Sequence, residues 1–195
     1  WGLNDYGQCY VPQPNTGFVA VSGGVQHSLG LKADGSIVAW GRNDHGQCNV
    51  PPPNTGFIAI AAGYDHSIAL RSDGSLAAWG WEFSGECHLP TPNAGFVAIG
   101  AGCGHSLALK ADSSVIMWGD NRYGECNVPA PNKSFVAIAE GRWHGLGLRA
   151  NGSIVTWGDN GYGQCNVPAP NADFMAIAAA YCHSLGLKSS GSVVS

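Results

Sequence analysis

Short apolar segments alternate with polar turns along the whole chain. The segments of one representative stretch are residues 57–62, 66–71, 75–80 and 48–50. The first is apolar and small, the second alternates in character, and the turn sequence Ser72-Asp73-Gly74 leads into the third. Short apolar or alternating runs bounded by Gly, Asp, Ser and Pro are typical of strands joined by tight turns. Pro51 and Pro53 would stop strand pairing after the short fourth segment. We therefore expect four antiparallel strands in each such stretch.

The same pattern recurs every 39 residues. Its clearest markers are five Trp-Gly pairs, which begin at Trp1, Trp40, Trp79, Trp118 and Trp157. They divide the chain into the units 1–39, 40–78, 79–117, 118–156 and 157–195. Four strands in every unit, with no helical period, are the pattern of propeller blades. The sequence therefore predicts an all-β protein with a single domain over residues 1–195, a five-bladed β-propeller of four-stranded repeats.

The two ends of the chain divide one strand between them. Residues 191–195 match the first part of a third strand, and Trp1-Gly2 match its remainder. We expect the two halves to pair and close the ring, because closure removes exposed strand edges. The alternatives are a piece of a longer array and a chain whose ends pair with those of a neighbour.

Composition and charge exclude several classes of partner. Charged residues make up 11% of the chain and hydrophobic residues 45%, with 29 Gly and 11 Pro, a composition that favours a folded, turn-rich protein. The formal net charge is −4, and no basic stripe is present to neutralise phosphates. We therefore expect neither nucleic acid nor a membrane surface as a partner.

The repeated motifs resemble those of a known family. W-G-x-N-x-x-G-Q, G-x-x-H-S-L-x-L and D-G-S-[ILV]-x-x-W-G resemble the regulator of chromosome condensation repeat over the entire chain. The form is most similar to the short-repeat branch that contains β-lactamase inhibitory protein II. The resemblance implies a propeller, usually of seven blades, and binding through aromatic residues in loops. It also implies a secreted or cell-surface location, whereas reduced thiols would favour the cytosol or a buried core, so the compartment stays open.

Cysteine and histidine also recur once in each unit. The periodic residues are Cys9, Cys48, Cys87, Cys126 and Cys165, and His27, His66, His105, His144 and His183. A free Cys behaves as a small hydrophobe, and the paired spacing of a metal site is missing, so we expect reduced thiols packed in the core. A His at the start of the same strand in every blade is most simply a repeated hydrogen-bonding element.

No arrangement of residues indicates catalysis. The His residues have no companion acid at matching places, and the Ser after four of them lacks the sharp turn of a nucleophile. We therefore expect no enzyme activity, no metal and no cofactor.

The residues that break the repeat carry the functional signal. Counting each Trp of the repeat as place 1, the copies differ most at places 3–6 and 23–26, which follow the third and first strands and should emerge on one face. Eight of the nine aromatic residues outside the repeated Trp and Phe places fall there, all but Tyr10. Tyr, Trp and Arg dominate binding hot spots. The candidate site comprises Tyr6, Arg42, His45, Tyr64, Asp65, Trp81, Phe83, Arg122, Tyr123, Arg142, Trp143, Tyr162 and Tyr181.

A broad face of mixed Tyr, Trp, Arg and Asp favours a protein partner. Carbohydrate is the alternative ligand, because sugars stack on exposed Trp and Tyr, although a lectin would repeat its site in every blade. A structural module of a larger repeat assembly is the third possibility.

Overall fold

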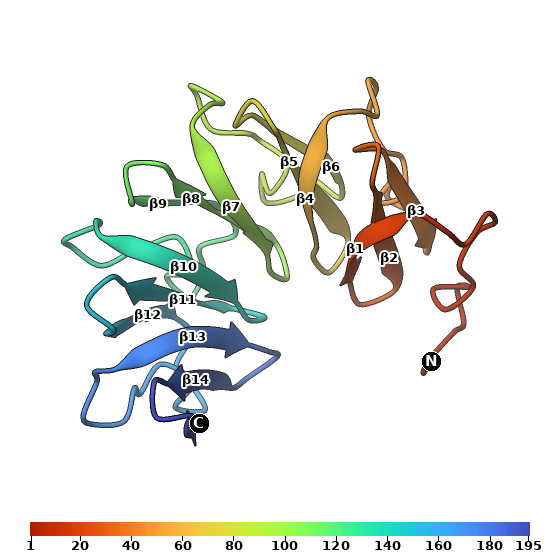
Figure 1. Ribbon diagram of the computed structural model, residues 1–195. Coiled ribbons are helices and arrows are strands. Elements are labelled where there is room, and N and C mark those ends of the chain that lie inside the picture. The colour runs from red at the N-terminus through yellow and green to blue at the C-terminus, as the bar shows by residue number, and fades with distance from the viewer.

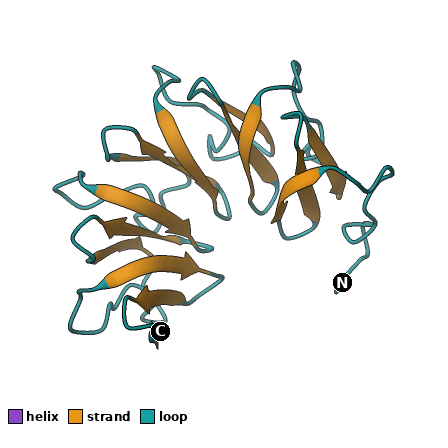
Figure 2. Cartoon of the chain, in the orientation of Figure 1, coloured by secondary structure: helices purple, strands orange, loops and turns teal.

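The computed structural model describes residues 1–195 and consists of strands and loops, without any helix that could cross a membrane (Figure 2). Its strands form five antiparallel sheets of three strands each, one sheet per repeat. We call each sheet a blade. The first three blades are β1 (Phe18–Gly23), β2 (His27–Lys32) and β3 (Ile37–Gly41); β4 (Phe57–Ala62), β5 (His66–Arg71) and β6 (Leu76–Gly80); and β7 (Phe96–Ala101), β8 (His105–Lys110) and β9 (Val115–Gly119). The last two are β10 (Phe135–Glu140), β11 (His144–Arg149) and β12 (Ile154–Gly158); and β13 (Phe174–Ala179), β14 (Ser184–Lys188) and β15 (Val193–Val194).

The strand order within each blade confirms the predicted hairpins. The first strand pairs with the second and the second with the third, in register over nearly their whole lengths. The first strands of consecutive blades also contact one another, which places these strands nearest the centre of the arc in Figure 1. Their small residues, such as Ala59 and Ala61, allow this close approach.

The predicted fourth strand is wrong. Cys48–Val50 lies in a loop, and the free edge of β3 is satisfied by a side chain instead. The Asn54 side chain accepts a hydrogen bond from the backbone N–H of Ile37 at 2.7 Å and donates one to its carbonyl at 2.9 Å. Asn93, Asn132 and Asn171 make the same pair of bonds in the next three blades. Because the amide group imitates one residue of a strand, the edge needs no fourth strand at that point.

The hydrophobic core lies between the blades. In one joint, Ile68, Leu70 and Leu76 of the second blade pack against Phe96 and Ala108 of the third blade. Equivalent clusters fill the other three joints between consecutive blades. Since every buried cluster contains residues from two consecutive blades, each blade depends on its neighbour for stability.

A polar contact accompanies each apolar joint. His27 Nε2 lies 3.0 Å from Ser67 Oγ in the next blade, and Ser67 Oγ donates a hydrogen bond to the Gln47 carbonyl at 2.9 Å. The same carbonyl accepts a hydrogen bond from Trp79 Nε1 at 2.9 Å. His66 and Ser106 repeat the contact, as do His144 and Ser184. The expectation that the periodic His residues are hydrogen-bonding elements is confirmed for these three.

The expected pairing of the two chain ends is not formed. β15 pairs only with β14, and the Trp1 side chain is fully exposed. The termini lie at opposite ends of an open arc (Figure 1). Consecutive blades are joined by equivalent apolar clusters, and five blades joined in this way form an arc that leaves the two chain ends apart (Figure 1).

Removal of one inter-blade hydroxyl tests the importance of the polar contact. In Ser106→Ala, His66 loses its only side-chain partner while its ring stays buried, so we expect the free energy of unfolding to fall by about 1–3 kcal/mol. The control Ser75→Ala removes a hydroxyl from an exposed turn, where we expect a loss below about 0.5 kcal/mol. Urea unfolding measures both. Equal effects of the two substitutions would contradict the proposed importance of the joint.

The buried His residues also predict a pH dependence of stability. Burial lowers the pKa of His27 from 6.5 to about 4 and the pKa of His66 from 6.5 to about 3. Between these values and 6.5 the unfolded chain binds protons that the folded chain does not, so stability falls as the pH is lowered from 7 to 4. Each such His contributes at most about 1.4 kcal/mol per pH unit. Urea midpoints from pH 4 to 7 should show a shallower dependence for His66→Gln than for the unchanged chain, and an unchanged slope would refute this origin.

Candidate functional site

The two sets of variable loops are adjacent on one face. The backbone N–H of Arg42 donates to the Gln26 carbonyl at 2.8 Å, and Trp81 makes the same bond to Asp65 at 2.8 Å. Gly80 precedes Trp81 with φ of 112°, and an added Cβ there would lie 2.6 Å from the Asp65 carbonyl oxygen, so only glycine allows the loops to approach this closely. The third and fourth blades repeat the contact. We call the surface made by these loops the loop face.

One group of predicted residues forms an ion-paired cluster between the first two blades. Arg42 Nε contacts Asp44 at 2.7 Å, and its Nη1 lies 3.5 Å from Asp65. Nη1 also donates to the Gln26 side chain at 2.8 Å. The Tyr6 ring lies 5.4 Å from the guanidinium carbon. The structure thus brings Tyr6, Arg42 and Asp65 together, with the Arg charge compensated by carboxylates of the chain itself.

A second group consists of aromatic side chains. The ring centroids of His45 and Trp81 are 4.0 Å apart in an edge-on arrangement, and those of Trp81 and Phe83 are 6.1 Å apart. Phe83 is 84% exposed, although it contacts another aromatic ring. We call these three residues the Trp81 cluster. Its members come from the loops of two successive units, so the predicted residues meet across a blade boundary.

The third group is centred on Arg142. Its guanidinium carbon lies 3.8 Å from the centroid of the Trp143 ring and 4.2 Å from that of Tyr181. The Tyr123 ring packs on Trp143 with centroids 5.3 Å apart. We call these four residues the Arg142 cluster. It joins the loops that follow β9, β10 and β13 into one aromatic surface.

The remaining predicted residues are more isolated. The Arg122 side chain folds back onto Asp120, with Nε 2.7 Å from Oδ2. Tyr162 is 79% exposed and stacks on no other aromatic ring. Tyr64 lines a cavity of about 210 Å³ near the centre of the arc, together with Cys103, Arg142 and Tyr181. We call this the central cavity; its walls are Gly and Ala residues of the first strands and the loops that follow them.

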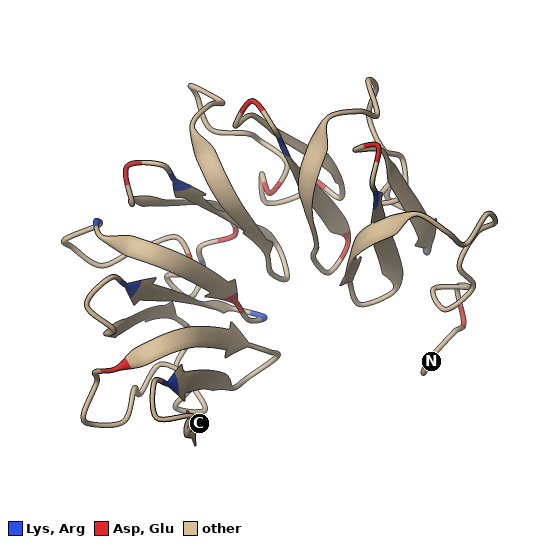
Figure 3. Ribbon diagram, viewed as in Figure 1, with Lys and Arg blue, Asp and Glu red and all other residues tan.

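Charged residues are few and dispersed over the blades, without a continuous basic band (Figure 3). The structure contains no group of three or more His, Cys, Asp or Glu side chains that could hold a metal ion.

The periodic Cys residues do not pack in the core as expected. All are free and only half-buried, in the loops that precede the first strands. Cys48 Sγ lies 3.2 Å from the carbonyl oxygen of Arg42, and Cys87 makes the same contact with Trp81. The thiol is thus a weak donor that fixes the loop, which a core hydrophobe could not be. Burial raises the pKa of Cys48 to about 11 and that of Cys87 to about 12, so both thiols stay protonated at neutral pH.

A buried acid–base pair in the third joint was not found by the sequence reasoning. His105 Nε2 lies 2.7 Å from Glu140 Oε1, with side-chain exposures of 0% and 3%. Burial alone would lower the pKa of His105, but the Glu140 carboxylate raises it above its ordinary value. Burial in turn raises the pKa of Glu140. The pair replaces the His–Ser contact of the other joints, because Gly145 stands where those blades have Ser.

Several neighbours are adapted to this pair. Gly100 is the one Gly at its place in the first strands, and a Cβ there would lie 2.9 Å from Glu140 Oε2. The Trp157 ring fills the space beside Gly145, and its Nε1 contacts Met117 Sδ instead of a carbonyl oxygen. The signal was present in the sequence, since Glu140 is the one charged residue in the five first strands.

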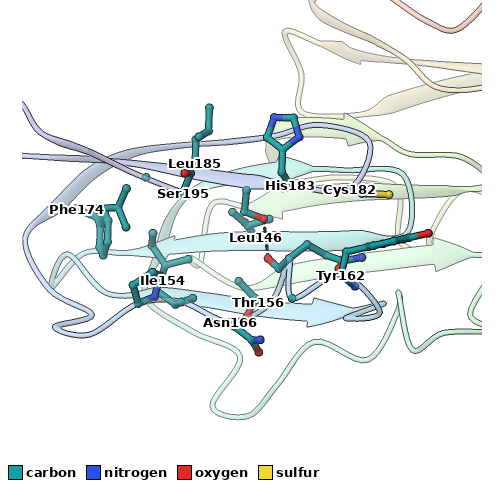
Figure 4. Close-up of a pocket in the computed structure, with 17 residues that line it drawn as sticks. Leu146, Ile154, Thr156, Tyr162, Asn166, Phe174, Cys182, His183, Leu185 and Ser195 are labelled. Carbon is teal, nitrogen blue, oxygen red and sulfur yellow. Dashed lines mark hydrogen bonds between the residues drawn. The ribbon is translucent and has the colours of Figure 1, made fainter.

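A second cavity, of about 320 Å³, lies at the fifth blade (Figure 4). It is lined by Ile154, Phe174 and Leu185 and by the turn around Gln164. The Gln164 carbonyl accepts a hydrogen bond from Ser184 Oγ, as the equivalent carbonyls do in other blades, where the repeated Trp also donates to it. The cavity therefore adjoins the joint between the fourth and fifth blades.

Comparison with known proteins agrees with this architecture. A family model described as the regulator of chromosome condensation (RCC1) repeat matches residues 18–47, 57–86, 96–125 and 135–164. No curated protein sequence matches the chain.

Among solved structures, the chain is similar to Prp20p from Saccharomyces cerevisiae, with a TM-score of 0.74 and 19% identity over 87% of this chain and 55% of that one. The structure of yeast RCC1 (Prp20) bound to Kap60 has a TM-score of 0.77 and 21% identity over 93% of this chain and 56% of that one. The CRINKLY WD40 ectodomain of the receptor kinase ACR4 from Arabidopsis thaliana has a TM-score of 0.74 and 25% identity over 100% of this chain and 71% of that one. The chain thus spans little more than half the length of the yeast structures.

The role of the His105–Glu140 pair in the third joint can be tested by restoring the Ser of the other repeats at position 145. We expect Glu140→Ala to lower the free energy of unfolding by about 3–5 kcal/mol, because it leaves His105 buried without its partner. Adding Gly145→Ser should recover part of this loss, once the Trp157 ring moves aside. The new hydroxyl would occupy the place equivalent to that of Ser106, whose Oγ lies 3.1 Å from His66 Nε2. Urea unfolding of both variants measures the recovery. A double variant no more stable than Glu140→Ala would show that the joint is not interchangeable with the others.

Proposed function

We propose that this chain, which belongs to the regulator of chromosome condensation (RCC1) repeat family, is a non-enzymatic binding scaffold that recognises a protein partner through the loop face. The observation that carries the proposal is the clustering of non-repeated aromatic and Arg side chains across blade boundaries. The Trp81 cluster and the Arg142 cluster together hold five of the aromatic side chains outside the repeated places. Large amphipathic side chains in contact with one another lose little conformational freedom on binding.

The rigidity of the support strengthens the proposal. Inter-blade backbone bonds run from Tyr64 N–H to the Gly102 carbonyl at 3.1 Å, and from Cys103 N–H to the Arg142 carbonyl at 3.1 Å. A further bond joins Arg142 N–H to the Tyr181 carbonyl at 3.3 Å. These bonds fix the loops relative to one another, as in other proteins that place binding loops on a rigid scaffold.

Two solved structures of one relative, yeast Prp20, are consistent with a protein partner. One is described by the binding of Prp20p to Gsp1p and histones, and the other by its complex with Kap60. Those partners belong to the yeast protein. What supports the present proposal is that propellers of the same fold bind proteins, together with a mixed Tyr, Trp, Arg and Asp surface of the kind that protein interfaces use. The net charge of −4 gives no attraction to nucleic acid or to an anionic membrane.

The proposal is tested by capture and quantitative binding. A partner captured on the immobilised chain is purified, and its Kd is measured for Trp81→Ala, Trp143→Ala and the control Ile58→Ala, which removes an exposed apolar side chain near the opposite end of a first strand. Hot-spot truncations cost at least about 2 kcal/mol, so we expect Kd to rise about 30-fold for at least one Trp variant and less than twofold for the control.

Two results would contradict a protein-binding loop face. One is a partner whose Kd is unchanged in both Trp variants. The other is a glycan array on which the chain binds defined sugars through Trp81 or Trp143 while no protein is captured, which would establish the carbohydrate alternative.

A further inference from the structure

The three Arg side chains of the loop face differ in how their charge is compensated. Arg42 lies against Asp44 and Asp65, and the Arg122 guanidinium is turned onto Asp120. Both guanidinium groups therefore have carboxylate partners within the chain. An arginine that is already paired gains little from a second carboxylate, because forming the new contact competes with the old one.

Arg142 has no such partner. No ion pair includes it, and its Nε is buried without a hydrogen-bond acceptor. The terminal Nη atoms do not share this burial, so they are the donors left for an acceptor from outside. A carboxylate that reaches the Nη atoms would gain charge-assisted hydrogen bonds without displacing an existing partner.

Two aromatic rings contact the guanidinium group of Arg142. The guanidinium carbon lies 3.8 Å from the centroid of the Trp143 ring and 4.2 Å from that of the Tyr181 ring. The backbone of the same residue is held by Cys103 and Tyr181 through the inter-blade bonds. A planar group held against aromatic rings can donate only from its edge, and a carboxylate, itself planar, accepts two parallel hydrogen bonds from such an edge.

The central cavity provides the space for a side chain to reach this group. Arg142 lines it together with Tyr64 and Tyr181, and the walls between them are Gly and Ala. Glu140 also lines the cavity, but its carboxylate is paired with His105. The unpaired charge at the cavity is therefore the positive charge of Arg142.

We propose that Arg142 is the specificity-determining residue of the loop face, and that it receives the carboxylate of an Asp or Glu side chain which a protein partner inserts into the central cavity. This inference rests on the proposed function, because it assigns the partner's chemistry at the same face. A single carboxylate matches the single unpaired guanidinium, whereas a phosphate dianion would bring a second negative charge close to Glu140.

The test uses random-sequence peptides displayed on phage and selected on the immobilised chain. Selected peptides are synthesised as matched pairs in which one Asp or Glu is replaced by Asn or Gln. The Kd of each pair is measured for the unchanged chain, for Arg142→Gln, and for the matched control Arg71→Gln, whose side chain contacts the Phe57 ring at the end of β5 away from the loop face. Arg142→Lys keeps the charge but removes the planar edge, and urea unfolding confirms that each variant is folded.

We expect replacement of the acidic residue to raise Kd about tenfold or more for the unchanged chain and for Arg71→Gln, and less than twofold for Arg142→Gln. Arg142→Lys should retain only part of the discrimination. The proposal is overturned if the discrimination persists in Arg142→Gln, if selected peptides carry no acidic requirement, or if phosphoserine peptides outcompete them through Arg142.

The outcomes separate this inference from the proposed function. Peptides that lose affinity in Trp81→Ala but show no acidic requirement would leave the binding face intact and exclude the role of Arg142. A selection that yields no peptide sensitive to either Trp81→Ala or Trp143→Ala would count against both.

Discussion

The contact on which the molecule depends is the joint between one blade and the next. A three-stranded blade has two large faces and buries little by itself, so it requires a neighbour. The repeated Phe and Leu side chains supply the apolar part of that joint. The hydrogen bonds from His66 to Ser106 and from Ser106 to the Glu86 carbonyl determine how the two blades are aligned. Apolar packing alone would tolerate sliding. The hydrogen bond between buried partners does not, because a displaced His would be left without an acceptor in a dry environment.

This division of labour explains how the chain can vary its surface without losing its fold. The side chains that form the apolar joints lie within the strands, whereas the loop-face residues contribute only backbone bonds between blades. Aromatic and charged side chains can therefore accumulate on the loop face at small cost in stability. The contacts between blades also determine the relative positions of the Trp81 and Arg142 clusters.

Much of the fold could be predicted from the sequence because the signal was repeated. The bounds of β4 and β5 follow from alternation and turn residues, and the shared face of the variable loops follows from strand order. The fourth strand was overpredicted because a side-chain amide, that of Asn54, satisfies the strand edge in a way that no apolar pattern records. Ring closure was overpredicted because the angle between blades comes from three-dimensional packing. Within the candidate site, sequence identified the residues but not their pairing, which separates Arg42 and Arg122 from Arg142.

The departures from the repeat are concentrated in one hairpin. Glu140, Arg142, Trp143 and Gly145 all belong to the segment that ends β10 and begins β11. A buried His–Glu pair is a more costly solution than the His–Ser bond used elsewhere, because two charged groups must leave water. Chain connectivity links this pair to the one uncompensated arginine of the loop face: Glu140 ends β10, Arg142 lies two residues later in the loop, and both residues line the central cavity. The carboxylate that could have neutralised Arg142 is instead committed to His105, and the guanidinium stays available for a partner.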